Sequence, residues 1–263
     1  MSVTGSALAE WEKAEVERSY AQAVRTGTLV KPTSAKIVER YLDPPADTAY
    51  ALEYAFHLLG DARGRSVLDF GAGDGRDTTL LAQHGANVWA LDISEDLLAI
   101  AEQRVRVDGW ADSVTLVCSS AHTVPLPDES MDIVWGDAIL HHLDLELTER
   151  EVYRLLKPGG RAIFKEPLRD SRLLRWLRPI IPYRQPDVSP YERPLLWREV
   201  TQFARRFSRF NYRCFDLPFV AASRVLGASK ERQAQLQQLD ADLLRRHAWL
   251  NRYATCVVFE LEK

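Results

Sequence analysis

The chain has 263 residues and a formal net charge of −3, with 46% apolar and 27% charged residues. This composition excludes a disordered chain, a collagen-like repeat and a disulfide-stapled miniprotein, and the length predicts one large domain with an appendage. The longest unbroken apolar run, Leu97–Ala101, is far shorter than the roughly 20 residues of a membrane-spanning helix. The acidic N-terminus has no signal-peptide core, so we expect a cytoplasmic protein.

The charge is unevenly distributed and the cysteines are few. Residues 161–213 carry thirteen Lys/Arg and five Asp/Glu, a net charge of +8. Such a basic segment could bind an anionic small substrate, a lipid surface or nucleic acid. Alternatively it forms a lid whose charges are only solvated. The three cysteines, Cys118, Cys214 and Cys256, are widely spaced, so we expect buried free thiols and no disulfide framework or zinc knuckle.

Two helices are expected before the first strand, over residues 6–25 and 48–59. Lys31-Pro32 and Asp43-Pro44-Pro45 interrupt the chain between them, because proline cannot continue a helix. We therefore predict an N-terminal helical cap over residues 1–60, followed by the main domain over residues 61–263.

The main domain begins with short apolar segments that alternate with helical ones. The expected strands are Ser66–Phe70, Asn87–Asp92, Val114–Cys118, Met131–Trp135 and Arg161–Glu166. They are apolar through their middles, which is typical of strands covered on both faces. One helix is expected over residues 77–84, and a second begins after an N-cap at Ser94. A third is expected to start at a capping box of Thr148 and Glu151 and to end at Leu156, before a tight turn at residues 157–160. This alternation predicts a Rossmann-like, doubly wound α/β fold.

The C-terminal third departs from this pattern. Five prolines between residues 179 and 194 predict a lid insertion over about residues 168–200. Its arginines at three-residue spacing, Arg169, Arg172, Arg175 and Arg178, suit a basic amphipathic helix that covers a pocket, touches an anionic substrate or makes weak peripheral membrane contact. Strands over residues 206–215 and 252–261, separated by a helix near 230–247, would complete a seven-stranded, mostly parallel sheet.

The most informative motif is the segment Val67–Gly75, a buried strand that runs into a G-x-G-x-G turn. Glycines let a ligand approach the backbone at the carboxyl end of the strand. The third glycine comes one position too early for a dinucleotide site, and Asp69 would repel a diphosphate but suits a positive amino group. Asp92, at the end of the second strand, can accept hydrogen bonds from both hydroxyls of a ribose. S-adenosylmethionine has the amino group and the ribose, and has no phosphate.

The ordered segments VLDFGAGDG, ALDIS and LKPGG, with DIVWGDAILHHL on strand four, resemble the class I S-adenosylmethionine-dependent methyltransferases of the small-molecule type. The resemblance covers about residues 64–166. It implies that the glycine loop holds the methionine moiety, that Asp92 holds the ribose and that residues 120–122 meet the adenine edge, although many relatives carry Asp where this chain has Ser120. The expected cofactor-binding residues are Asp69, Gly71, Ala72, Gly73, Asp92, Ile93, Ser120, Ala121, His122 and Gly136.

Methyl transfer is an in-line displacement, in which alignment can supply about 7 to 11 kcal/mol. A hydroxyl acceptor also profits from a general base, and histidine is suited to that role. His141 and His142 follow strand four and Glu166 ends strand five, so these three are the catalytic candidates. Alternatively the histidines only pack, or they form, with Asp137 and Glu166, a divalent-metal site like that of some quinone-type relatives. We expect no metal.

Aromatic residues in the lid and the cap suggest the acceptor. Tyr183, Tyr191, Trp11 and Tyr20 could line an apolar or aromatic pocket, so we expect O-methylation of a small secondary metabolite. The basic segment favours a nucleic-acid methyltransferase as a rival, but residues 136–139 lack the [ND]-P-P-[FY] sequence that clamps a flipped base. Asp69 and the glycine spacing disfavour an NAD-dependent oxidoreductase. A non-catalytic cofactor-binding subunit whose basic lid docks a partner remains an alternative.

Overall fold

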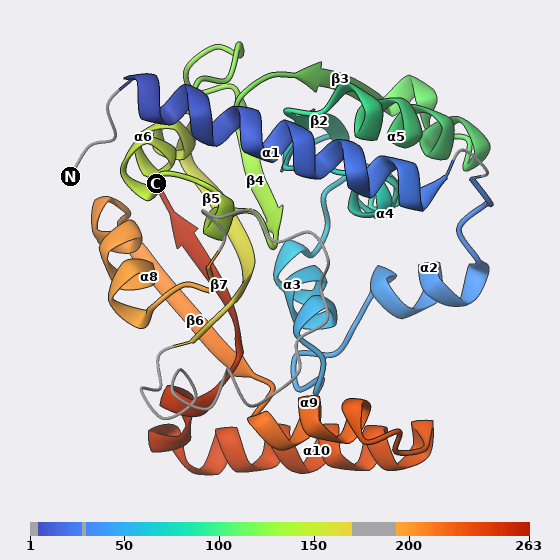
Figure 1. The fold of residues 1–263 in the computed structure, drawn as a ribbon, viewed down its shortest axis with the longest axis vertical. Helices are drawn as coiled ribbons and strands as arrows, with labels where there is room; N and C mark the ends of the chain where they lie inside the picture. Colours follow the sequence, from blue (N-terminus) through green and yellow to red (C-terminus); the bar gives the residue numbers. More distant parts are fainter. Residues whose placement is uncertain (1–4, 28–29, 170–192) are drawn as a thin grey trace.

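The computed structural model describes residues 5–27, 30–169 and 193–263. Its strands form one seven-stranded sheet with helices packed against it (Figure 1). The strands are β1 (Ser66–Phe70), β2 (Asn87–Asp92), β3 (Val114–Cys118), β4 (Met131–Asp137), β5 (Leu156–Pro167), β6 (Arg209–Phe215) and β7 (Cys256–Glu262). Their order is β3-β2-β1-β4-β5-β7-β6, and β7 alone runs opposite to the other six strands. The predicted seven-stranded, mostly parallel, doubly wound fold is confirmed.

Helices cover both faces of this sheet. They are α1 (Gly5–Thr26), α2 (Ala35–Leu42), α3 (Ala51–Leu59), α4 (Arg76–Gln83), α5 (Glu95–Val107), α6 (Leu145–Leu155), α8 (Trp197–Phe203), α9 (Pro218–Val225) and α10 (Lys230–Arg246). On one face, α3 and α4 contribute Phe56 and Leu81 to a core around Trp135 of β4. On the other face, α6 and α8 contribute Val152 and Phe203 to a second core. The two cores fix the strand ends that carry the polar motifs.

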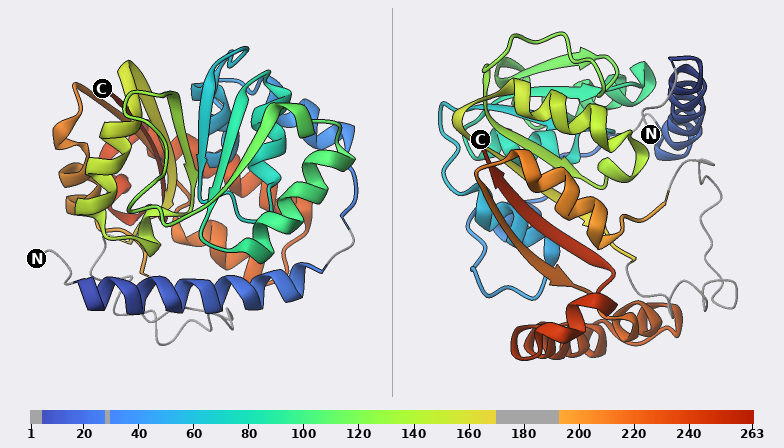
Figure 2. Two further views of the ribbon diagram at one scale, coloured as in Figure 1. Left: turned by 90° about the horizontal axis from the view of Figure 1, so that it is seen from above. Right: turned by 90° about the vertical axis from the view of Figure 1, so that its left-hand side faces the viewer.

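The N-terminal segment divides into two parts with different roles. Helix α1 runs across the carboxyl ends of the strands (Figure 2), where Ala23 packs on Leu97 and Ile100 of α5. The chain after α1 is fastened by Asp108, whose carboxylate accepts hydrogen bonds from the backbone and hydroxyl of Thr33 at 2.7 and 2.6 Å. Helix α3, in contrast, is part of the packing layer of the sheet. Within the expected cap, α1 is therefore the helix that covers the strand ends.

The start of α6 differs from the prediction. Its N-cap is Asp144, which accepts hydrogen bonds from the backbone of Glu146 and Leu147 at 3.0 Å each. Thr148 is buried inside the helix and its hydroxyl bonds to the carbonyl of Asp144, while the Glu151 carboxylate accepts from the backbone of Val124. The predicted capping box of Thr148 and Glu151 is wrong, because a better cap lies one turn earlier.

The predictions for four strands also need correction. β3 is the sheet edge and partly exposed, so Cys118 at its end is exposed rather than buried, whereas Cys214 is buried. β5 already begins at Leu156, and residues 157–160 form an irregularity within it instead of a turn that precedes it. The segments expected to open β6 and β7 begin as the 3-10 turns η4 (Ala204–Arg206) and η5 (Ala248–Tyr253).

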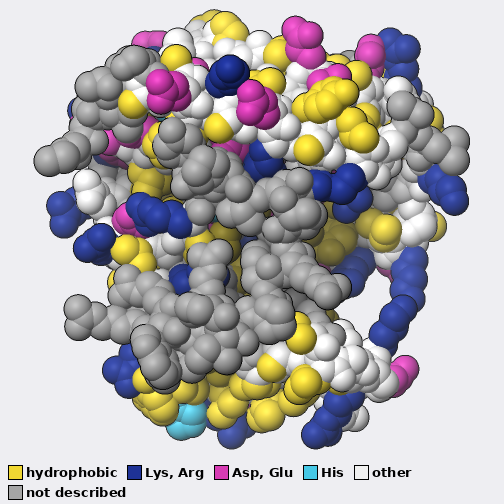
Figure 3. Space-filling view, viewed as in Figure 1, with side chains coloured by type: hydrophobic (Ala, Val, Ile, Leu, Met, Phe, Trp, Pro, Cys, Tyr) yellow, Lys and Arg dark blue, Asp and Glu magenta, His cyan; other side chains and the backbone are white. Residues whose placement is uncertain are grey.

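The expected lid falls mainly outside the described residues, and so do Arg172, Arg175, Arg178, Tyr183 and Tyr191. Its described ends belong to the core: Leu168 and Leu195 form a bridge, and Val200 of α8 is buried. Along the described parts of the chain, no helix combines the length and the apolar character needed to cross a membrane. The face that carries α1 shows acidic side chains along its upper edge and basic ones across its middle (Figure 3).

Candidate active site

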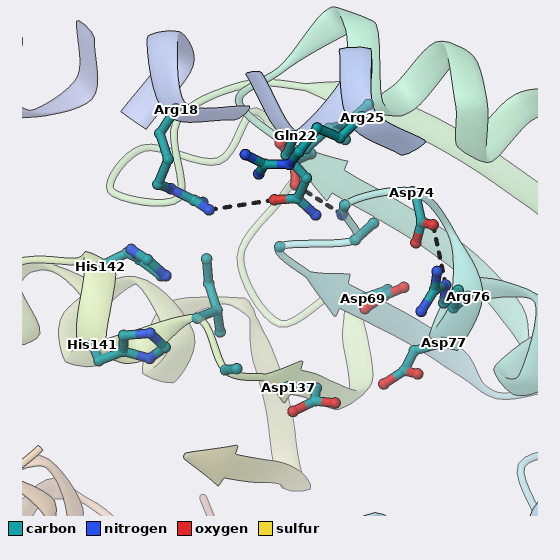
Figure 4. A pocket seen from close by; sticks show the side chains of 17 residues that line it. Arg18, Gln22, Arg25, Asp69, Asp74, Arg76, Asp77, Asp137, His141 and His142 are labelled. Atoms are coloured by element: carbon teal, nitrogen blue, oxygen red, sulfur yellow. Dashed lines mark hydrogen bonds and ion pairs between the residues drawn. The ribbon is translucent and has the colours of Figure 1, made fainter. Parts of the chain in front are cut away.

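A cavity of about 710 Å³ lies at the carboxyl ends of β1, β2 and β4, beneath α1. Figure 4 shows the two histidines at one end of this main cavity, aspartates at the other, and polar side chains that reach down from α1. The lining residues are Arg18, Gln22, Arg25, Asp69, Gly71, Ala72, Gly73, Asp74, Arg76, Asp77, Asp92, Leu97, Asp137, Ala138, Ile139, His141 and His142. Most residues of the predicted glycine loop and the predicted histidines are therefore brought together.

The glycine loop is shaped by backbone positions that only glycine fills easily. Gly71 has φ +87°, and a Cβ at this position would lie 2.6 Å from Cδ1 of Ile139. Its N–H donates to the carbonyl of Leu91 on β2 at 2.9 Å. The side chain of Ile139, from the segment after β4, therefore packs directly against the loop, and both line the same cavity.

Asp92 is fixed by the backbone around it. Its Oδ2 accepts a hydrogen bond from the N–H of Gly73 at 2.8 Å, and its Oδ1 accepts from the N–H of Ser94 at 2.9 Å. Burial raises the pKa of Asp92, and these two N–H donors oppose that rise. The carboxylate is thereby held rigidly at the end of β2, where it lines the main cavity.

The floor of the main cavity is acidic. The Asp69 carboxylate accepts from the hydroxyl of Thr78 at 2.6 Å, that of Asp77 accepts from the indole of Trp135 at 2.9 Å, and Asp137 pairs with Lys165. Burial, and then the charge of Asp77, raise the pKa of Asp69 well above its usual range. Burial and Asp137 raise the pKa of Asp77 to about 7. A positively charged ligand relieves this repulsion, whereas a diphosphate would increase it.

His141 is held from below by a buried glutamate. Oε2 of Glu166 lies 2.8 Å from Nδ1 of His141, and Oε1 accepts from the N–H groups of Ile139 and Leu140 at 2.8 and 2.7 Å. A carboxylate acceptor places the proton of the neutral imidazole on Nδ1 and its lone pair on Nε2. As the end residue of a strand, Glu166 was expected to face the crevice and orient the acceptor. It has no exposed surface and lines neither cavity, so it supports His141 instead.

His142 meets a glutamate from α1 that the sequence reasoning missed. Its Nδ1 lies 3.3 Å from Oε2 of Glu15, and its ring centre is 4.0 Å from that of His141. Glu15 is buried and accepts from Nε of Arg18 at 2.9 Å. The only signal for such contacts was the helical spacing of polar residues 12, 15 and 19, which also fits an exposed helix face.

The residues of the alternative metal site are engaged elsewhere. Asp137 pairs with Lys165, and both oxygens of Glu166 are occupied by backbone N–H groups and His141. Within the described ranges, no three His, Cys, Asp or Glu side chains lie together as metal ligands would. The geometry thus favours a histidine held by a carboxylate over a ligand cluster.

A second, smaller cavity, the side cavity, opens from the main one between β2, β3 and α1, with Ile93, Ala121, Ser120 and His122 in its wall. Trp11 also lines it, whereas Tyr20 is 57% exposed and lies outside both linings. Gly136 does not line either cavity. A Cβ there would lie 2.5 Å from the ring of Phe164, so this glycine serves packing within the sheet.

Comparison with known proteins agrees with this geometry. Residues 68–164 match a methyltransferase domain family. These residues therefore carry a methyltransferase domain, in agreement with the resemblance of the sequence to the class I S-adenosylmethionine-dependent methyltransferases. Methyltransferase GfsG of Streptomyces halstedii is 34% identical over 123 residues, 46% of this chain and 44% of the relative. A dimethylglycine N-methyltransferase of Parasynechococcus marenigrum is 33% identical over 174 residues, 60% of each chain. The chain thus spans about half the length of these relatives.

The fold of the family is also found in solved structures. A Haemonchus contortus phosphoethanolamine N-methyltransferase 2 in complex with S-adenosyl-L-methionine aligns with a TM-score of 0.53 at 16% identity, over 90% of this chain and 54% of the other. The cofactor of this methyltransferase family is S-adenosylmethionine. The residues present fit it: an acidic floor for a cationic group, a rigid Asp92 for a ribose, and a glycine loop between them.

Proposed function

We propose that the chain transfers a methyl group from S-adenosylmethionine to a small molecule, most specifically to a hydroxyl of an apolar or aromatic secondary metabolite. The observation that carries this proposal is the contact of His141 with Glu166, because His141 lines the same cavity as the glycine loop and Asp92. A proton acceptor and a donor site that share one cavity are what O-methylation needs.

The donor would be held by residues at the ends of β1 and β2. Asp92 would bind the ribose, the loop around Gly71 and Gly73 would face the methionine moiety, and the buried carboxylate of Asp69 would attract the amino group. When bound, S-adenosylmethionine supplies an electrophilic methyl group on a positively charged sulfur. The acidic floor favours that charge and disfavours diphosphate cofactors.

His141 would act as the general base. Its Nε2 lone pair takes the proton from the acceptor hydroxyl, and Glu166, at 2.8 Å from Nδ1, stabilises the imidazolium that forms. General-base assistance of this kind contributes about 10² to 10⁴-fold to a rate. The two backbone N–H groups on Oε1 keep Glu166 in place while the charge on the ring changes.

A separate cavity with apolar walls supports an apolar acceptor, although it shares no lining residue with the main cavity. A cavity of about 350 Å³ is lined by Leu168, which comes two residues after Glu166, and by Trp197, Tyr212 and Trp249. The rings of Trp197 and Tyr212 meet edge to face at 4.5 Å. Flat, apolar side chains in a concave site favour an aromatic or hydrocarbon group.

N-methylation of a small amine is a second candidate. Its support is the 33% identity to a dimethylglycine N-methyltransferase, together with the acidic floor of the main cavity, which suits a cationic acceptor. A nucleic-acid acceptor has less support, because many basic side chains of residues 161–213 are already paired within the chain. These pairs are Arg161–Glu260, Lys165–Asp137, Arg193–Glu199, Arg206–Glu149 and Arg209–Glu262.

Radiolabelled methyl transfer distinguishes these functions. The chain is incubated with methyl-labelled S-adenosylmethionine and a small-molecule extract, and the labelled product is analysed by mass spectrometry. We expect an apolar methyl ether. A labelled methylamine would select the second candidate, and label in RNA or DNA only would refute both. Absence of donor binding in calorimetry would refute methyl transfer itself.

A further inference from the structure

The side cavity contains a carboxylate that comes from α1, more than 100 residues away in the sequence. Oε1 of Glu12 accepts hydrogen bonds from the hydroxyl of Ser120 and from Nδ1 of His122, the latter at 3.1 Å. Nε2 of His122 accepts from the N–H of Asp144 at 3.0 Å, which requires that the proton of the neutral ring be on Nδ1. Glu12 is therefore held by two donors on a single oxygen.

The second oxygen of Glu12 is the one that can serve a ligand. Among the described residues, Oε2 meets no hydrogen-bond donor, and the side chain is 28% exposed where it borders the side cavity. The other carboxylates of this cavity are engaged, since Glu15 bonds to Arg18 and Asp92 bonds to two backbone N–H groups. Glu12 thus presents an acceptor in the wall of the cavity that Asp92 also lines.

The remaining walls suit a flat ring. Ile93, Ala121 and Leu143 are apolar, and Trp11 closes the cavity from α1, with its ring 6.4 Å from that of His122. The side cavity also shares Gly71 and Asp92 with the main cavity. A base attached to a ribose at Asp92 would therefore enter between apolar surfaces with its outer edge toward Glu12.

We propose that Glu12 of α1 is a cofactor-binding residue that accepts a hydrogen bond from the exocyclic amino group of adenine. The inference deepens the proposed function, because it concerns the same donor site. Ser120 and His122, which the sequence analysis placed at the adenine edge, then act indirectly by positioning the carboxylate. The adenine site is completed by a helix that lies outside residues 68–164.

The test compares two nucleosides that differ at this one group. S-adenosylhomocysteine carries the 6-amino group, and S-inosylhomocysteine carries a 6-oxo group that a carboxylate repels. Binding is measured by calorimetry for the wild type, Glu12→Ala and Glu12→Gln. Glu17→Ala is the matched control, because Glu17 is on the exposed face of the same helix. Thermal unfolding of each variant verifies that it folds.

We expect the wild type to prefer the adenosine compound by about 10-fold to 100-fold, the range for one hydrogen bond to a charged acceptor. Glu12→Ala should remove this preference by weakening the adenosine compound alone, Glu12→Gln should reduce it, and Glu17→Ala should preserve it. If Glu12→Ala weakened the binding of both compounds equally, Glu12 would only hold α1 in place, and the proposal would be overturned. Unchanged binding of both compounds by Glu12→Ala would also overturn it. If the wild type bound neither compound, the donor site itself would be refuted.

Discussion

Replacing Glu166 by glutamine tests the assignment of the base most directly. The change keeps the shape of the side chain but turns one of its acceptors into a donor. Oε1 of the glutamine can still accept from the N–H groups of Ile139 and Leu140, so its NH₂ group must face Nδ1 of His141. A donor there moves the ring proton to Nε2, which removes the lone pair that would take the proton of the acceptor.

The size of the effect follows from these contacts. Loss of the base should lower kcat by about 10² to 10⁴-fold. Two hydrogen bonds to a carboxylate become bonds to an amide, at about 1 kcal/mol each, so the free energy of unfolding should fall by about 2 kcal/mol. The affinity for S-adenosylhomocysteine should stay within twofold, because Glu166 is fully buried beneath His141 and lines neither cavity.

Two assays check this prediction, with Glu260→Gln as the control. Glu260 accepts from Arg161 at 2.8 Å on β7, so its loss should affect stability without affecting kcat. Nitrogen-15 NMR of labelled histidine reports the tautomer of His141 without any acceptor, and methyl transfer to the identified acceptor reports kcat. A wild-type rate in Glu166→Gln, or an unchanged tautomer, would refute the role of the pair.

Other predictions concern the donor site. Asp92→Ala removes two hydrogen bonds to ribose, at about 1.5 to 3 kcal/mol each, and should weaken S-adenosylmethionine binding in calorimetry by at least about 100-fold; a loss below threefold would contradict the ribose assignment. The pKa of Asp77 is about 7 in the folded chain and 3.8 in the unfolded chain, so the free energy of unfolding of the wild type should fall as pH rises from 4 to 7. Asp77→Asn should remove this pH dependence and be more stable at pH 8 by up to about 4 kcal/mol in urea unfolding. Parallel pH profiles of the two proteins would contradict the raised pKa. Gly71→Ala places a methyl group 2.6 Å from Ile139 at φ +87° and should lower the free energy of unfolding by about 2 to 3 kcal/mol in thermal unfolding. Gly64→Ala, at φ +71° with open space around the added methyl group, should show the cost of the backbone strain alone. Equal losses in the two variants would exclude a steric clash with Ile139.

The sequence predicted what depends on local pattern. The bounds of β1, β2 and β3 were right, because each is a short, mostly apolar segment that ends at or just before a polar or glycine residue. The conformation of the glycine loop was also predictable, because its positive φ angles fall on glycines of the motif itself. Pairing across long separations has no local signal, so the contacts of Glu12 and Glu15 with residues after β3 and β4 were missed.

The outcome for Glu166 shows a related limit. The sequence places it at the end of β5, but successive side chains of a strand point to opposite faces. Whether Glu166 or Lys165 lies on the side of His141 depends on the register of β5 against β4 and β7, which is set by packing of the whole sheet. The edge position of β3, and hence the exposure of Cys118, likewise depends on strand order.

The packing of Ile139 against Gly71 joins two parts of the site that otherwise belong to different strands. The residue before Ile139, Ala138, has φ +57°, a conformation that a side chain tolerates only where its surroundings hold it. The segment that carries His141 is therefore wedged onto the glycine loop and cannot drift from it. We therefore expect the proposed base and the proposed donor loop to keep a fixed spacing, because a shift of one segment would press Ile139 against the other.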